Sequence, residues 1–331
     1  MVASRQSPFA VVRDGDHVPQ HLRHGVIAIG NFDGVHRGHR AVIETAIARA
    51  RSAGKPAAAL TFEPHPRSFF QPDAPSFRLS PEAAKLRLMA ASGLDGAIVL
   101  TFDAALAGLT AEEFITRVLL ERLAVFGVVV GFNFHFGKDR SGSPEFLTAQ
   151  GARRGFLVDV VAPFMLKGVR VSSGMVRAAL SAGHAAEAAD FLGYPWFVTG
   201  QVIHGDRRGR QLGYPTANLE VEPECGLKHG IYAVRVGVEG RRYDGVASFG
   251  RRPMFDSGVV LLEVYLFDFS GDLYDKTLDV AFITWIRPEL KFDMISDLVR
   301  RMDEDTRIAR AALARVPDLF PPIAPTATTA T

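Results

Sequence analysis

Residues 30–39 read GNFDGVHRGH, and this stretch is the strongest indication of the fold of the first half of the chain. It directly follows the apolar run Val26–Ile29 and precedes a helical pattern of apolar residues that continues to about residue 50. A glycine-rich turn between a buried strand and a helix is typical of the ligand-binding edge of a parallel sheet. Since glycines let the backbone approach a polyphosphate, the stretch predicts an α/β domain with a phosphate site at this turn.

His36 and His39 lie three residues apart at the predicted start of that helix. This spacing lets both imidazoles point the same way on the first turn and donate to phosphate oxygens as charge develops. The alternative, two ordinary surface histidines, is common for an isolated pair at this spacing. The glycine-rich context favours the phosphate site, and a zinc site is disfavoured because no cysteine pair or third histidine stands at matching spacing.

Short apolar runs and helical patterns alternate from about residue 9 to residue 182. They predict strands at 57–62, 97–100 and 125–130, with helices near 81–89 and 111–123. Such alternation is typical of a parallel sheet with helices on both faces.

Two further segments of this half should reach the same sheet edge. The loop Phe62-Glu63-Pro64-His65-Pro66 either presents an aromatic ring and an imidazole or is a plain proline turn. Ser172 or Ser173 is predicted to cap a helix, and Arg177 one turn later either holds a phosphate or is an ordinary helix residue.

Residues 132–136, FNFHF, alternate aromatic and polar side chains. The alternation predicts a strand. It is either a half-buried strand whose aromatic face lies in the core, or one that presents Asn133 to a nucleotide with an aromatic ring stacked nearby.

The pattern changes near residue 193, where helices give way to six strand-like runs at 196–203, 216–221, 230–238, 244–249, 259–267 and 277–285. Six short strands without helices between them predict a small antiparallel barrel or sandwich. One helix follows, with Asp293 as its predicted N-cap. We therefore predict domains at 1–184 and 185–316, and a disordered tail at 317–331.

Residues 204–218 join a glycine-rich basic loop to a strand. Glycines and arginines suit close approach to a triphosphate, and Thr216 and Asn218 offer oxygen ligands of the kind that magnesium accepts. A solvated basic hairpin is the alternative.

Glu263 interrupts an apolar strand. A carboxylate in such a run is either exposed at an edge or a general base for a substrate hydroxyl. Arg287 and Glu289, just before the last helix, can form ion pairs.

Composition limits the classes of protein. A chain of 331 residues exceeds the size of most single cores, so two domains are expected. A net charge of +2, from 38 basic and 36 acidic residues, is too balanced for a protein that coats nucleic acid or an anionic membrane. Cys225 is the only cysteine, which excludes an intramolecular disulfide and favours a reducing cytoplasm. No apolar run suits a signal peptide or a membrane span.

Together these stretches resemble the prokaryotic bifunctional riboflavin kinase and FAD synthetase family. The motifs GNFDGVHRGH, TFEPHPR and VSSGMVR are similar to those of its adenylyltransferase module, and HGDRRGRQLGYPTANL, GIYAVRV, LLEVYLFDF, GDLY and IRPELKF to those of its kinase module. The resemblance implies a Rossmann-like nucleotidyltransferase domain followed by a six-stranded kinase barrel with a C-terminal helix. It also implies that ATP phosphorylates riboflavin to FMN, and that FMN is then adenylylated to FAD with release of pyrophosphate.

The resemblance further implies roles for individual residues. His36, His39 and Glu263 would be catalytic. The nucleotide of adenylyl transfer would be bound by Gly30, Phe32, Asp33, Gly34, Asn133, Ser172, Ser173 and Arg177. The nucleotide of riboflavin phosphorylation would be bound by Gly205, Arg210, Gly213 and Pro215, with Mg²⁺ on Thr216 and Asn218. Flavin would be bound by Phe62, His65, Pro66, Arg287 and Glu289.

The chain departs from the family pattern at a few positions. Asn133 and His135 stand where the family often has an acid and an arginine, and Gly174 lacks the hydroxyl of a third serine or threonine. In the kinase half, Ser248 and Met254 replace an asparagine and a threonine. These changes bear on the rate or nucleotide preference of adenylyl transfer more than on the fold.

Two other functions compete with this interpretation. The first half could adenylylate another phosphorylated acceptor, with the barrel as a regulator, but the loop before Thr216 and Glu263 disfavour that. The barrel could instead bind oligonucleotides, but its basic loop contains only one aromatic residue, Tyr214. We expect the partners to be ATP, riboflavin and FMN, with no nucleic acid and no membrane, and the sequence leaves open whether the chain forms a homo-oligomer.

Overall fold

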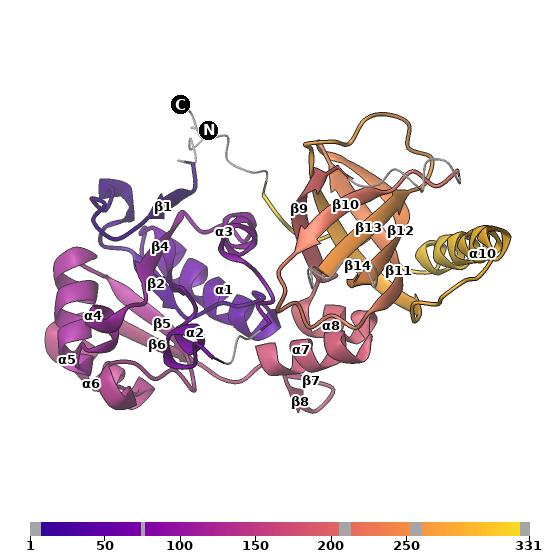
Figure 1. Cartoon of the computed structure of the whole chain (residues 1–331). Helices are drawn as coiled ribbons and strands as arrows, with labels where there is room; N and C mark the ends of the chain where they lie inside the picture. Colours follow the sequence, from indigo (N-terminus) through magenta and orange to yellow (C-terminus); the bar gives the residue numbers. More distant parts are fainter. Residues whose placement is uncertain (1–7, 74–76, 205–212, 252–259, 325–331) are drawn as a thin grey trace, which may run out of the picture. The chain divides into compact units, whose positions relative to one another are not determined.

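The structure is a computed structural model that describes residues 8–73, 77–204, 213–251 and 260–324. The chain divides into two compact units, coloured along the sequence in Figure 1. The first holds described residues of 8–73, 80–172 and 322–324, and the second those of 77–79 and 173–321. The sequence-based boundary between residues 184 and 185 stays a prediction of where the chain can be cut into independently folding domains.

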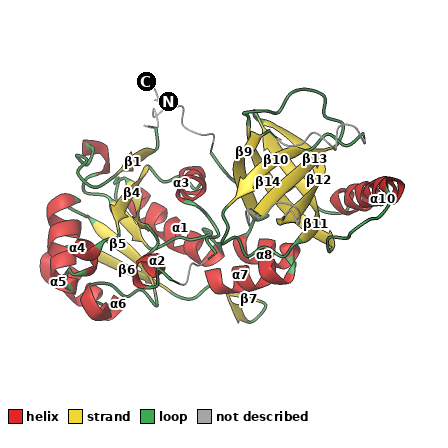
Figure 2. Ribbon diagram, in the orientation of Figure 1, coloured by secondary structure: helices red, strands yellow, loops and turns green. Residues whose placement is uncertain are grey.

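The first unit is built on a six-stranded parallel sheet of order β1-β4-β3-β2-β5-β6, drawn in yellow in Figure 2. Its strands are β1 (Ala10–Val12), β2 (Val26–Ile29), β3 (Ala57–Glu63), β4 (Gly96–Thr101), β5 (Gly127–Gly131) and β6 (Leu157–Val161). The strand order reverses between β2 and β5, which is where ligands bind to open sheets of this kind. The predicted parallel α/β domain is confirmed.

Helices connect these strands: η1 (Gln20–Leu22), α1 (Arg37–Ser52), α2 (Pro66–Phe70), α3 (Glu82–Ala91), α4 (Ala104–Ala107), α5 (Ala111–Glu113), η2 (Phe114–Arg122), η3 (Lys138–Arg140) and α6 (Pro144–Arg154). The helix predicted near 111–123 is present, but its main part, η2, is a π-helix. A small hairpin follows β6 and consists of β7 (Met165–Leu166) and β8 (Val169–Arg170).

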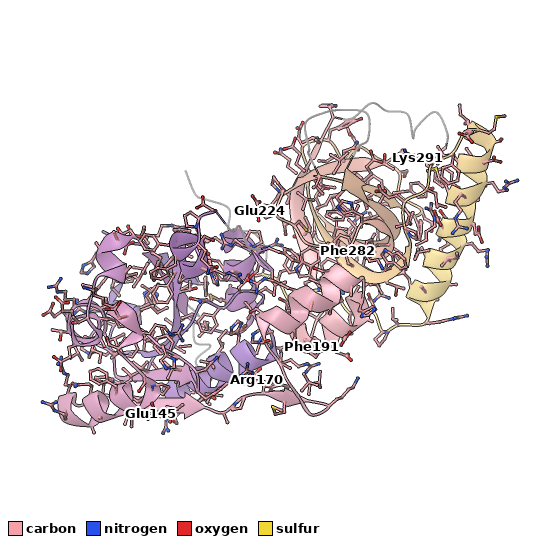
Figure 3. The ribbon with its side chains drawn as sticks, turned by 60° about the horizontal axis from the view of Figure 1, so that its bottom comes forward. Glu145, Arg170, Phe191, Glu224, Phe282 and Lys291 are labelled. Carbon is pink, nitrogen blue, oxygen red and sulfur yellow. The ribbon has the colours of Figure 1, made fainter. Side chains whose placement is uncertain are left out.

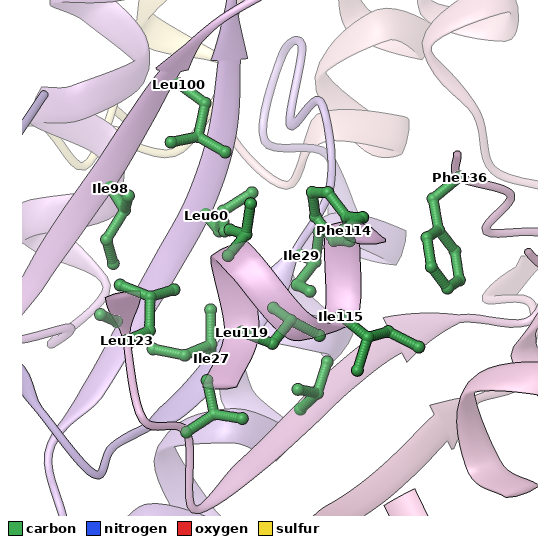
Figure 4. Close-up of a cluster of buried hydrophobic side chains, with 14 of the residues drawn as sticks. Ile27, Ile29, Leu60, Ile98, Leu100, Phe114, Ile115, Leu119, Leu123 and Phe136 are labelled. Carbon is green, nitrogen blue, oxygen red and sulfur yellow. The ribbon is translucent and has the colours of Figure 1, made fainter. Parts of the chain in front are cut away.

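One face of the sheet and the π-helix form the core of this unit. Figure 4 shows Ile115 and Leu119 of η2 together with Ile27 and Ile29 of β2 and Leu60 of β3. Each of these side chains is at most 2% exposed. Because burial of such a side chain contributes roughly 1.5–3 kcal/mol, this cluster fixes strand β2, which leads into the turn at residues 30–36.

The second unit contains two helices, α7 (Ser173–Ala182) and α8 (Ala185–Leu192), and a closed antiparallel barrel of order β10-β13-β12-β11-β14-β9. The barrel strands are β9 (Phe197–Ile203), β10 (Ala217–Val221), β11 (Gly230–Val238), β12 (Arg241–Arg251), β13 (Val260–Leu266) and β14 (Thr277–Arg287). All six predicted strands are present, and the barrel is confirmed. Phe282, labelled in Figure 3, is fully buried and contacts the rings of Trp196 and Tyr232.

Helix α10 (Ile295–Ala314) closes the second unit. It packs on β11, β12 and β14, with Ala309 and Leu313 buried against the barrel. The predicted N-cap Asp293 is wrong, because the cap position is Met294, which has no capping side chain.

The segment after α10 is held by Arg235 of β11, which is 5% exposed. Its guanidinium donates to the carbonyl oxygens of Leu313, Val316 and Pro317 at the end of the helix. Phe320 lies under the guanidinium of Arg242 at 4.8 Å. Residues 317–320 thus contact the barrel in this structure, and residues 325–331 lie outside the described part of the chain. The disordered tail at 317–331 stays a prediction.

Candidate active sites

The turn between β2 and α1, residues 30–36, is called the phosphate loop below. Its end places His36 at the N-cap of α1, where Nδ1 accepts from the backbone N–H of His39 at 3.2 Å. The two imidazoles stack with centroids 3.6 Å apart and planes 14° from parallel. In neutral His36 the proton then lies on Nε2, which becomes the donor. His36 is only 6% exposed, so the alternative of two ordinary surface histidines does not fit.

His39 is held in its neutral form. Burial lowers the pKa of its imidazole well below the usual value, and electrostatic interactions with His36, Lys85 and His65 lower it further. Its Nδ1 is buried without a hydrogen-bond partner among the described residues. An anion placed here would supply the missing partner and would favour the protonated imidazole.

The phosphate loop has a strained backbone. Phe32 and Val35 have positive φ angles of 50° and 36°, which is rare for large or β-branched residues. Gly34, at φ 82°, takes the left-handed conformation that glycine allows. A side chain at Gly30 would meet the ring of Phe32 at 3.2 Å, so this glycine leaves room for the buried ring.

Asp33 and Gly34 are bound to the segment before α3. The backbone N–H of Ser80 donates to Oδ1 of Asp33 at 3.0 Å, and the N–H of Gly34 donates to Oγ of Ser80 at 2.8 Å. Asp33 therefore shapes the loop in this structure, and its predicted contact with ATP stays a prediction. Sequence reasoning missed Ser80, because nothing in a serine before a proline indicates a partner 46 residues away.

The segment 62–66 leaves β3 and enters α2. His65 is the N-cap of α2 and accepts from the N–H of Arg67 at 3.1 Å, and Pro66 is the first helical residue. Phe62 is 8% exposed and packs edge-on against Phe102 at 5.9 Å. The predicted flavin contacts of these residues are not tested by this geometry.

Exposed aromatic rings lie beside this segment, and sequence reasoning missed them. Phe70 is 65% exposed and Phe69 is 37% exposed, and both rings pack against Phe102. Exposed phenylalanines at the carboxyl edge of a parallel sheet offer a flat apolar surface next to His65.

Residues 132–136 do not form the predicted strand. Strand β5 ends at Gly131, whose carbonyl accepts from the N–H of Phe134 at 3.0 Å, so the chain turns there. Phe132 is consequently 37% exposed, whereas Phe136 is 8% exposed. The guanidinium of Arg170, labelled in Figure 3, lies 5.7 Å from the ring of Phe132.

Asn133 and His135 are exposed in this turn, where Nδ1 of His135 lies 3.0 Å from the carbonyl oxygen of Asn133. Arg170, which sequence reasoning did not single out, thus adds a cation near the predicted nucleotide contact Asn133.

Helix α7 begins at Ser173, so Ser172 precedes it as predicted for a cap. Nε of Arg177 donates to the carbonyl oxygen of Phe77, within the second unit. Ser172 belongs to the first unit, and Ser173 and Arg177 to the second. Their convergence on one nucleotide stays a prediction.

In the barrel, three residues stand side by side on neighbouring strands. Asn218 of β10 is opposite Glu263 of β13, which is opposite Ser248 of β12. Opposite residues of antiparallel strands point to the same face. Asn218 is 7% exposed, and its Oδ1 is buried without a hydrogen-bond partner in the described part of the chain. Thr216 lies just before β10, so its predicted position on a strand is wrong.

Glu263 is half-buried between Leu262 and Val264, which are fully buried. A second carboxylate, that of Glu289, lies against Gly250, where an added Cβ would come within 2.2 Å of its Oε1. Burial raises the pKa of Glu289, His229 and Arg287 lower it, and the charge of Glu263 raises it further. The two carboxylates therefore share one electrostatic environment.

Arg287 is engaged by α10. Its Nε lies 2.9 Å from Oδ1 of Asp305, and its Nη2 lies 2.5 Å from Oδ2. Both side chains are buried, at 8% and 3% exposed. Sequence reasoning missed Asp305 as the partner, and the flavin contact of Arg287 stays a prediction.

The basic loop is described only at its end. Gly205 and Arg210 lie outside the described residues, as does Met254. Gly213 and Pro215 are exposed. Between them, the hydroxyl of Tyr214 donates to Asp303 of α10, and burial followed by this bond raises the pKa of Tyr214 to about 12.

Comparison with known proteins identifies the class. A family model described as FAD synthetase matches residues 18–175, and one described as riboflavin kinase matches residues 192–313. With the parallel sheet and the barrel, these matches define an adenylyltransferase unit followed by a kinase unit.

The chain is 41% identical to the bifunctional riboflavin kinase/FMN adenylyltransferase of Pseudomonas fluorescens over 297 residues, which is 89% of this chain and 95% of that protein. It is 38% identical to the protein of that name from Escherichia coli, over 86% of this chain and 91% of that one. The solved structure of a macrolide-efflux protein from Streptococcus pneumoniae is 30% identical, with a TM-score of 0.80 over 91% of this chain and 98% of that one.

The chain therefore belongs to the family of bifunctional riboflavin kinases/FMN adenylyltransferases. It phosphorylates riboflavin to FMN with ATP and adenylylates FMN to FAD. FMN is thus the acceptor of the adenylyl group, in place of the other phosphorylated acceptor considered from the sequence. None of the described helices is both long and apolar enough to cross a membrane.

Proposed function

We propose that the two reactions are carried out by His36 and His39 in the first unit and by Glu263 in the second. For adenylyl transfer, the supporting observation is the stacked imidazole pair at the start of α1. An FMN phosphate oxygen attacks the α-phosphorus of ATP, and pyrophosphate leaves as the bond to it breaks. The two imidazoles donate to the phosphate oxygens on which negative charge builds up, which costs little reorganisation because they are already in place.

For riboflavin phosphorylation, the supporting observation is the pairing of Asn218 with Glu263 across β10 and β13. The ribityl hydroxyl attacks the γ-phosphorus of ATP while its proton passes to the Glu263 carboxylate, and ADP leaves. The Glu263 carboxylate is half-buried and points to the same face as Asn218, where it can accept the proton of the ribityl hydroxyl.

We also propose Mg²⁺ as the cation of the kinase site, with Thr216 and Asn218 as its protein ligands. The buried Oδ1 of Asn218 fits this, since an amide oxygen is a suitable ligand for a hard cation. When bound, Mg²⁺ neutralises part of the triphosphate charge.

Flavin binding in the first unit is assigned to Phe62, His65 and Pro66, extended by the exposed ring of Phe70. A planar apolar ring system that covered this exposed phenylalanine would bury apolar surface, which favours binding. We place both reactions in the cytoplasm, because a chain whose only cysteine is Cys225 needs no oxidising compartment.

Replacement of His36 or His39 by alanine tests the first assignment. We expect adenylyl transfer to fall by about 10²- to 10³-fold in kcat, as for loss of one preorganised donor. Conversion of riboflavin to FMN should continue at the parent rate, since the kinase residues lie in the other unit. Separation of flavins by chromatography measures both steps, and unchanged FAD formation in both variants would refute the assignment.

A further inference from the structure

Lys85 of α3 is buried, with only 2% of its surface exposed. Lysine is almost never buried unless it is paired. Its Nζ lies 2.6 Å from Oε1 of Glu63 and 3.1 Å from Oγ1 of Thr61, both at the carboxyl end of β3. It also lies 3.4 Å from the carbonyl oxygen of Asn31, in the phosphate loop. These acceptors use the three N–H donors of the ammonium group.

Thr61 completes the network. Its side chain is fully buried, and its hydroxyl donates to the carbonyl oxygen of Asn31 at 3.2 Å while its oxygen accepts from Lys85. The carbonyl of Asn31 is therefore held by two donors, one of them charged. Hydrogen bonds to charged groups contribute more to stability than neutral ones do.

The phosphate loop needs such restraint because its backbone is strained at Phe32 and Val35. Backbone conformations of this kind are unfavourable and persist only where the surroundings hold them. Ser80 fixes the middle of the loop at Asp33 and Gly34, and Lys85 fixes its start at Asn31. Both come from one segment, the N-terminal end of α3 and the residues just before it.

We infer that Lys85 is a positioning residue for adenylyl transfer: through Asn31 and Thr61 it holds the phosphate loop in the conformation that sets His36 and His39. Lys85 is itself too buried to bind ATP. The inference rests on the proposed role of the two histidines. Nothing in the sequence indicates it, because a lysine in an amphipathic helix is ordinarily a solvated residue.

Lys85→Met keeps the length of the side chain and removes its charge and donors. We expect kcat for FMN adenylylation to fall by about 10- to 100-fold, since displacement of a catalytic group by about 1 Å can cost that much. KM for ATP and FMN should change little. Riboflavin phosphorylation in the same preparation should be unchanged, and residual adenylylation with parent KM values reports that the first unit is folded. The matched control is Lys55→Met, which removes an exposed lysine of the same unit and should leave both reactions unchanged.

Two further variants cover the case in which Lys85→Met does not fold. Thr61→Val keeps the shape of a buried side chain and the Lys85–Glu63 pair but removes one donor to Asn31, so a smaller fall in the same kcat is expected. In Lys85→Met combined with Glu63→Leu, no unpaired carboxylate remains. If the double variant regained parent kcat, Lys85 would serve only to neutralise Glu63, and the inference would be wrong.

The remaining outcomes also decide the matter. A parent kcat in Lys85→Met and Thr61→Val would overturn the inference, as would loss of both reactions together or a change confined to KM. His39→Ala is measured in parallel. If His39→Ala loses adenylylation while Lys85→Met and Thr61→Val keep it, only the inference on Lys85 fails. If His39→Ala is fully active, the proposed role of the histidines fails. As a readout besides activity, NMR titration should give a higher pKa for His39 in Lys85→Met, because a nearby positive charge is gone.

Discussion

Glu263 is the residue on which the proposed kinase mechanism depends most directly. Its strand neighbours Leu262 and Val264 face the barrel interior, and it lies opposite Asn218 on the other face. Glu263→Gln keeps the shape and removes the proton acceptor. We expect riboflavin phosphorylation to fall by about 10²- to 10⁴-fold, as is usual for loss of a general base, while added FMN is still converted to FAD. Steady-state kinetics of the two steps measure this.

The exposed-edge alternative predicts nearly parent phosphorylation in Glu263→Gln, so a normal turnover rate would end the assignment. Glu289 would then be the next carboxylate to test, because burial and the neighbouring Glu263 already raise its pKa. Glu220→Gln is a suitable control, since this exposed carboxylate lies on β10, two residues after Asn218.

At the scale of elements, α10 is attached to the barrel by charge as well as by apolar packing. Asp305→Asn leaves the buried guanidinium of Arg287 without its counter-ion. Breaking a buried pair costs about 3–5 kcal/mol, so the free energy of unfolding of the second unit should fall by about 3 kcal/mol. Trp196 and Trp285 are the only tryptophans and both belong to this unit, so urea unfolding followed by their fluorescence reports on it alone.

The matched control is Asp297→Asn on the same helix, which breaks the exposed pair with Arg300 at 3.0 Å. Exposed ion pairs contribute less than about 1 kcal/mol, so we expect only a small decrease in the free energy of unfolding. Equal shifts in the two variants would contradict the proposed difference between the buried and the exposed pair.

The elements themselves were largely predictable, because each has a strong local signal. Strands such as 57–62 are continuous apolar runs, and the barrel strands are separated by turn residues. Alternation misled at 132–136, since a single turn hydrogen bond to Gly131 overrides a two-residue period. The ion pairs of Lys85 and Asp305 were not predictable, because their partners are distant in sequence and only packing brings them together.

At the scale of the whole molecule, each reaction has its proposed catalytic residues within one compact unit: His36 and His39 in the first, Glu263 in the second. The predicted cut at residue 184 would remove α7 from the second unit. Leu180 of α7 is fully buried, its carbonyl accepts from the N–H of Lys228, and Ser181 donates to the carbonyl of Gly226. By its packing and hydrogen bonds, helix α7 thus belongs to the second unit.

We therefore expect a fragment of residues 173–331 to fold alone and phosphorylate riboflavin at close to the parent rate, without forming FAD. A fragment of residues 185–331 should phosphorylate riboflavin too, but unfold at lower urea concentration, because α8 loses the apolar residues of α7 that pack on it. Tryptophan fluorescence during urea unfolding compares the two fragments with the full chain. An inactive or insoluble 173–331 fragment would show that the kinase unit depends on parts of the chain before residue 173, which include residues 77–79 of the second unit. Equal stability of the two fragments would instead support the sequence-based boundary at residue 184, since α7 would then contribute nothing to the barrel unit.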